Sequence, residues 1–243
     1  MREHEGWAEV CGGAASKVPP AFPLFATADL RAVIGDPGRR LRALRAGGRI
    51  VTIARGIHVA VPDGADRAWL PGAEEAGWRV AAARFGLEAP YVSGLTAASL
   101  HGATPRSSAF MHVTVPRQTR ARRLDELGTL VEFHTRDERV LGSPLWRLRR
   151  GDERTWGPDV MSMVGELGPV RVASQIQTVL DLLHSPWRSG SSDRARDAVE
   201  RLMRGVSDAE IDAVARGQRR HSAAERTRFQ RLGRWVRDPD LRA

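Results

Sequence analysis

The sequence predicts an α+β protein with two domains. Two short helical segments and a β-rich hairpin follow one another between residues 22 and 62. A turn-rich segment at 62–66 comes next, and beyond it strand-like runs alternate with amphipathic helical runs. We therefore expect an N-terminal domain at residues 1–64, with its compact core at 22–62, and a mixed α/β domain with a helical C-terminus at 65–243.

Two helices are expected at the start of the first domain. Thr27 is a suitable N-cap for the first helix, which ends at Gly35. The second helix begins after Asp36, again an N-cap, and Pro37 occupies its first position, where the missing N–H of proline costs nothing. It runs to about Ala46, because two consecutive glycines follow.

A β-hairpin is expected directly after the second helix. Residues 49–53 and 56–61 are two β-rich runs that are joined around Arg55. Helix, short turn, helix and hairpin in this order are the elements of a winged helix-turn-helix. We therefore expect that fold within residues 22–62.

The second domain is expected to mix strands with helices and to end in three helices. Strands are predicted at 110–115, 129–134 and 170–172. Helices are predicted at 72–85, 95–101, 174–183, 193–203, 207–216 and 222–236.

The charge of the chain favours a polyanionic partner. The formal net charge is +9, the pI is near 11.2, and Lys17 is the only lysine, so nearly all basic residues are arginines. A GC-rich genome gives a similar composition, so the position of the charge has to decide. Residues 25–62 hold seven arginines against two aspartates. Positive charge is therefore concentrated on the expected winged helix-turn-helix.

The second helix is expected to carry the DNA contacts. If Leu41 and Leu44 face inward, a rotation of about 100° per residue turns Arg39, Arg42 and the small Ala43 outward. Arginine both holds phosphate and pairs with guanine O6 and N7. The predicted DNA-binding residues are Arg39, Arg40, Arg42, Ala43, Arg45, Arg49, Thr52 and Arg55. The alternative is a winged helix used for protein contacts, in which these arginines are only solvent-exposed charges on the helix surface.

The second domain adds further arginines. Arg117 and Arg120 directly follow an expected strand, and we predict that they contact DNA phosphate. The other arginine clusters of this domain have three alternative roles. They extend the DNA footprint, contact an acidic partner or form a solvated face.

Two segments of the chain resemble AbiEi-type antitoxins. Residues 41–59 are similar to a helix of that family that ends in glycine, the strand after it, an Arg-Gly turn and the start of the next strand. Residues 92–104 resemble the family's helix of Ser-Gly, small residues and Leu-His-Gly. A strand and a helix follow in the family's order, at 112–116 and 177–183. His58 departs from the pattern, because the family usually has tyrosine or tryptophan there.

The resemblance covers residues 25–185 and implies a function. It implies an antitoxin of a type IV toxin–antitoxin (abortive infection) system, whose partner is a nucleotidyltransferase-like toxin. The winged helix would then repress the shared operon by binding double-stranded DNA at inverted repeats of its own promoter, and the second domain would counteract the toxin. The alternative is a winged-helix transcriptional regulator whose C-terminal domain senses a ligand or oligomerises.

No catalytic residue and no cofactor are expected. A nuclease core with Glu-x-Lys, a P-loop and a Schiff-base enzyme each need a lysine, and Lys17 lies outside all such motifs. Gly142-Ser143 is not followed by the Asp-x-Asp of a nucleotidyltransferase, so the chain resembles that enzyme's partner. A nucleic-acid enzyme with an unrecognised site stays the third alternative.

No metal site is expected either. His112 and His134 are predicted on neighbouring strands, but we expect no carboxylate or third histidine to complete a set of ligands. Cys11 is the only cysteine, which excludes an internal disulfide. No run approaches the roughly 18 apolar residues of a membrane span. We therefore expect no membrane partner and a cytoplasmic location.

Overall fold

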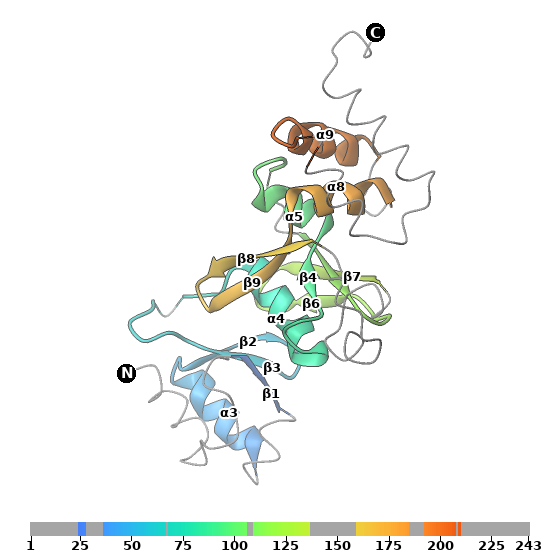
Figure 1. Ribbon diagram of the computed structural model, residues 1–243. Helices are drawn as coiled ribbons and strands as arrows, with labels where there is room; N and C mark the ends of the chain where they lie inside the picture. The colour runs from blue at the N-terminus through green and yellow to red at the C-terminus, as the bar shows by residue number, and fades with distance from the viewer. Residues whose placement is uncertain are drawn as a thin grey trace.

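The computed structural model describes residues 24–27, 36–66, 68–105, 109–136, 159–184, 192–207 and 209. Over this part of the chain the protein is mixed α/β, with five α-helices and two β-sheets (Figure 1). The elements are β1 (Leu24–Ala26), α3 (Pro37–Ala46), β2 (Ile50–Ala54), β3 (Ile57–Ala60), α4 (Ala73–Phe85), β4 (Tyr91–Val92), α5 (Gly94–Leu100), β5 (Phe110–Val115), β6 (Arg122–Leu124), the 3-10 helix η1 (Asp125–Leu127), β7 (Thr129–Thr135), β8 (Val160–Gly165), β9 (Gly168–Ala173), α8 (Gln175–His184) and α9 (Ser192–Met203).

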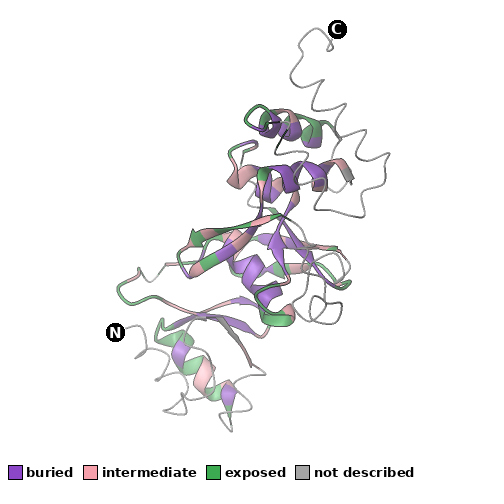
Figure 2. Cartoon of the chain, in the orientation of Figure 1, coloured by how far each residue is buried: buried purple, intermediate pink, exposed green. Residues whose placement is uncertain are grey.

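The helix α3 has the bounds that the sequence predicts. Asp36 caps it, because its Oδ1 atom accepts hydrogen bonds from the backbone N–H groups of Gly38 and Arg39 at 3.1 and 3.3 Å. Pro37 and Leu44 are its buried residues, so only a narrow stripe of α3 faces the protein. The remaining surface of this helix is therefore half-buried or exposed (Figure 2).

A three-stranded antiparallel sheet follows α3, with the strand order β1-β3-β2. The tight turn between β2 and β3 consists of Arg55 and Gly56, and Gly56 has φ 75°, a conformation that favours glycine. The hairpin is confirmed, and β1 is a strand that the sequence analysis did not predict. The expected first helix, residues 27–35, lies outside the described residues except for Thr27. The winged helix-turn-helix therefore stays a prediction.

A six-stranded mixed sheet forms the centre of the rest of the molecule, in the order β6-β7-β5-β4-β9-β8. The pairs β5–β7 and β4–β9 are parallel, and the other neighbours are antiparallel. Helix α4 covers one face of this sheet and lies between it and the small sheet, whereas α5 and α8 lie on the other side and α9 packs beyond α8 (Figure 1). The strands β4, β6 and β8 were not predicted from the sequence.

Two apolar clusters hold these layers together. The first joins the small sheet, α4 and the large sheet, and it includes Ile53, Val59, Trp78 and Val113. The second lies between α5, α8 and α9, where the amphipathic faces of these helices meet. The predicted domain boundary falls in the mostly exposed segment 62–66, but the first cluster includes side chains from both sides of it. The division into two domains stays a prediction.

The C-terminal helices expected at 207–216 and 222–236 lie almost wholly outside the described residues. Among the helices of the described part, none is long and apolar enough to cross a membrane.

Candidate nucleic-acid interface and histidine–glutamate cluster

The outer face of α3 presents arginine side chains to solvent. Arg39, Arg42 and Ala43 are exposed, as the helical spacing predicts. The Arg39 side chain is 86% exposed, and its Nε atom lies 3.8 Å from Asp36 Oδ2. A loose and exposed ion pair of this kind contributes about 0–1 kcal/mol, so a stronger anionic ligand can displace the carboxylate from the guanidinium group.

The flank of α3 contacts the larger part of the molecule through Arg45. Its Nη2 atom donates a hydrogen bond of 2.8 Å to Glu126 Oε1 in η1. Arg45 is a predicted DNA contact, and local sequence patterns do not reveal its protein partner, because Glu126 is 81 residues away along the chain. Of the other predicted DNA contacts on and directly after α3, Arg40 is half-buried and Arg49 is exposed.

The hydroxyl of Thr52, another predicted DNA contact, is engaged inside the small sheet. Its Oγ1 atom lies 2.9 Å from His58 Nδ1, and His58 Nε2 lies 3.0 Å from Thr27 Oγ1. Burial lowers the pKa of His58, and the positive charge of Arg45 lowers it further. A neutral His58 donates through one ring nitrogen and accepts through the other. It therefore joins β2 and β3 to the residue that follows β1.

The turn of the hairpin lies against the large sheet. Arg55 is exposed at this turn, and its backbone carbonyl accepts a hydrogen bond from the guanidinium group of Arg122 in β6. Arg117 and Arg120 are exposed in the loop between β5 and β6. The structure thus joins the hairpin, through Arg122, to the strand at the end of that loop.

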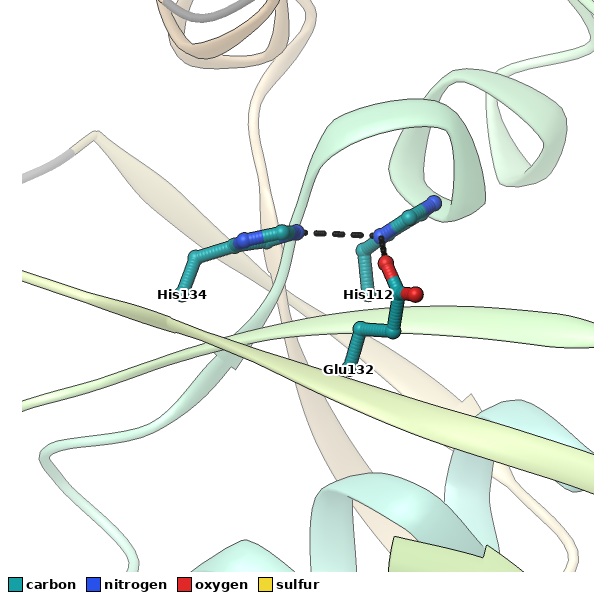
Figure 3. Close-up of side chains that lie close together, drawn as sticks. All are labelled: His112, Glu132 and His134. Carbon is teal, nitrogen blue, oxygen red and sulfur yellow. Dashed lines mark hydrogen bonds and ion pairs between the residues drawn. The ribbon is translucent and has the colours of Figure 1, made fainter. Parts of the chain in front are cut away.

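A second group of polar side chains lies on the large sheet, on the face toward α5. The parallel register of β5 and β7 sets His112 opposite Glu132, and His134 follows two residues later on the same face. The Nδ1 atom of His112 lies 3.0 Å from His134 Nε2 and 3.5 Å from Glu132 Oε2 (Figure 3). The two imidazole rings are stacked, with centroids 5.1 Å apart.

This arrangement corrects the expectation that no carboxylate accompanies the two histidines. The three side chains offer ligand atoms that all lie within 4.8 Å of one another, which is a spacing that can hold a metal ion. The His112 side chain is 8% exposed and that of Glu132 is 39% exposed. Burial lowers the pKa of His112 to about 4, so its imidazole is neutral at physiological pH.

The same side of the sheet carries a buried polar network next to this cluster. Arg136, directly after β7, donates a hydrogen bond of 2.8 Å to Asp181 Oδ1 in α8, and the Gln177 amide donates to the same oxygen at 2.7 Å. The Tyr91 hydroxyl lies 3.4 Å from Asp181 Oδ2, and burial raises the pKa of this tyrosine. These contacts fasten α8 to the sheet, and we assign them a structural role.

No protein-family model matches the chain, and no curated protein matches it. Among solved structures, the crystal structure of the RV2827C protein from Mycobacterium tuberculosis is similar, with a TM-score of 0.55 at 18% sequence identity. The match covers 97% of this chain and 78% of that protein. At this level of identity the similarity shows the fold alone.

Proposed function

We propose that this chain is a DNA-binding protein, with α3 as the recognition helix and the β2–β3 hairpin as the wing. The observation that carries the proposal is the exposed face of α3, where Arg39, Arg42 and the small Ala43 are all exposed. A helix of 10 residues is about 15 Å long and 10–12 Å wide, dimensions that fit the major groove. Ala43 lets the helix axis approach the bases, and each arginine has the fork of donors that pairs with guanine.

The hairpin supports the same proposal. Arg55 is exposed at its turn, the position from which a wing contacts the DNA backbone or the minor groove. Arg117 and Arg120 are exposed in a loop that ends at β6, the strand that bonds this turn through Arg122. We propose that the two loop arginines extend the footprint to neighbouring phosphates.

The biological role that we propose is that of an antitoxin in a type IV toxin–antitoxin system. The chain would repress its own promoter and counteract a nucleotidyltransferase-like toxin encoded by a neighbouring gene. The support is the resemblance of residues 41–59 and 92–104 to AbiEi-type antitoxins. In the structure the first segment includes most of α3 and the hairpin, and the second includes α5 and the residues on either side of it.

A second candidate is a transcriptional regulator whose C-terminal domain senses a ligand. The partly buried cluster of two histidines and a glutamate on β5 and β7 favours it, because polar groups that converge on one point are typical of ligand sites. Growth rescue on co-expression with the neighbouring gene product supports the antitoxin. A DNA affinity that depends on a small ligand or ion, without growth rescue, supports the regulator.

The DNA-binding proposal is tested by fluorescence anisotropy with a duplex of the chain's own promoter. We expect Arg39→Ala and Arg42→Ala each to weaken binding by about 1–3 kcal/mol if the contact is to a base. Arg196→Ala is the matched control, since this exposed arginine lies on α9 at the opposite end of the molecule (Figure 1) and its loss removes the same charge. Equal affinities for all four proteins would refute the assignment of α3.

A further inference from the structure

The cluster of His112, Glu132 and His134 is a product of the sheet register. In parallel strands the side chains that face each other across the ladder share one face, and residues two apart along a strand share it too. The pairing of β5 with β7 therefore sets three side chains with ligand atoms on the same patch of the sheet. Their ends converge on one point instead of spreading into solvent (Figure 3).

The spacing of the ligand atoms is close to that around a tetrahedral metal ion. Bonds of about 2.0–2.2 Å from zinc to imidazole nitrogen and carboxylate oxygen, at tetrahedral angles, separate the ligand atoms by about 3.3–3.5 Å. The observed separations from His112 Nδ1 are 3.0 Å to His134 and 3.5 Å to Glu132. The third separation, between the ligand atoms of Glu132 and His134, is within 4.8 Å.

The chemistry of the three groups also fits a cation. A carboxylate only accepts hydrogen bonds, and a neutral imidazole presents one lone pair. Both Glu132 Oε2 and His134 Nε2 approach the same Nδ1 atom of His112, which can donate only one proton. A divalent cation bound at the point of convergence interacts with the lone pairs of all three groups at once.

We propose that His112, Glu132 and His134 bind one Zn²⁺ ion. Two imidazoles with one carboxylate form a ligand set that suits zinc, whereas Mg²⁺ and Ca²⁺ prefer oxygen ligands alone. Over the described residues the group has these three members. Because the Glu132 side chain is 39% exposed, water completes the coordination from the solvent side. The ion would cross-link β5 and β7, and this site does not depend on the proposed DNA-binding function.

The test is a metal titration of the full-length chain after dialysis against a chelator. We expect isothermal titration with ZnCl₂ to show one site per chain. Loss of an outer-shell partner costs 10–100-fold in metal affinity, so Glu132→Gln and His134→Gln, which remove a ligand directly, are expected to weaken binding by at least about 100-fold. Glu88→Gln is the matched control, because Glu88 is an exposed carboxylate outside the cluster. Cys11→Ser controls for thiolate ligation.

Three results would overturn the site. The first is a wild-type chain that binds no Zn²⁺, which would leave a cluster of protein groups that contact one another. The second is binding that survives in both ligand variants, and the third is binding that is lost in Cys11→Ser. If a ligand variant does not fold, the absorption spectrum of the Co²⁺-loaded wild-type chain decides. A tetrahedral spectrum without thiolate charge transfer supports the site, and an octahedral or thiolate spectrum contradicts it.

Discussion

Glu75 of α4 forms a buried ion pair whose removal is expected to destabilise the whole fold. Its Oε1 atom accepts hydrogen bonds from Arg79 Nε at 3.1 Å and Nη2 at 2.9 Å, and from the backbone N–H of Leu167 at 2.8 Å. Arg79 also donates to the Leu167 carbonyl. The two charged side chains are 2% and 6% exposed. This pair therefore holds the turn between β8 and β9 against helix α4.

The substitution Glu75→Gln keeps the shape of the side chain but removes the carboxylate that pairs with the buried Arg79 charge. Removing one partner of a buried pair costs about 3–5 kcal/mol, and we expect about 3 kcal/mol because the amide oxygen still accepts from Leu167. For a chain of this size that loss lowers Tm by about 6–12 °C. Thermal unfolding followed by circular dichroism at pH 7 measures the shift.

A matched pair on the surface serves as the control for this experiment. Glu200 lies 3.3 Å from Arg196 on α9 with the same i,i+4 spacing, but the arginine is 59% exposed. Glu200→Gln is expected to cost less than about 1 kcal/mol. In addition, we expect the double variant Glu75→Gln/Arg79→Met to lose less unfolding free energy than the two single variants lose together. The reason is that the double variant buries neither charge of the pair. A drop in Tm as small as that of the control would refute the reasoning.

Three further predictions concern the small sheet and α3. Asp36→Ala removes the N-cap and should lower the free energy of unfolding by about 1 kcal/mol, measured by urea denaturation; an unchanged midpoint would contradict the capping role. Glu126→Gln removes an acidic group and releases Arg45 from its ion pair. Promoter affinity should therefore rise by about 2–5-fold at low salt, which is a gain of under about 1 kcal/mol. A weaker complex would show instead that the ion pair helps to position α3. The pKa of His58 is lowered in the folded chain, so the unfolded chain binds its proton more readily and stability is lost as the pH falls below about 6.5. His58→Asn should reduce the loss of Tm between pH 7.5 and 5.5, and an identical loss in both proteins would exclude His58 as the cause.

The elements that the sequence predicts best are those with local signals. Helix α3 was placed at its observed bounds because Asp36-Pro37 and Gly47-Gly48 mark its ends. The hairpin was predicted because two β-rich runs enclose an Arg-Gly turn. The long runs that became α4 and β5 were predicted within one residue of their observed bounds. Capping and turn residues act within a few positions along the chain, so they can be recognised without the tertiary structure.

The strands that the sequence analysis missed have no such signals. β1, β4 and β6 are two or three residues long, too short for an alternating pattern, and the sheet around them defines them. β8 has six residues, but its sequence VMSMVG does not alternate between apolar and polar residues. The metal-ligand cluster was missed for a related reason. Glu132 and His134 are two residues apart on one strand, which places them on one face, but only the register of β5 against β7 sets His112 opposite Glu132. That register depends on tertiary packing.

We propose that arginines of α3 contact guanines in the major groove, and methylation interference tests this claim most directly. Methylation of guanine N7 removes the acceptor that an arginine uses there. We predict that N7-methylated guanines in the promoter duplex block binding of the wild-type chain, and that Arg42→Ala loses the interference at one of these guanines while it keeps it at others. Binding that tolerates N7 methylation at every guanine, with an unchanged pattern in Arg42→Ala, would contradict the claim.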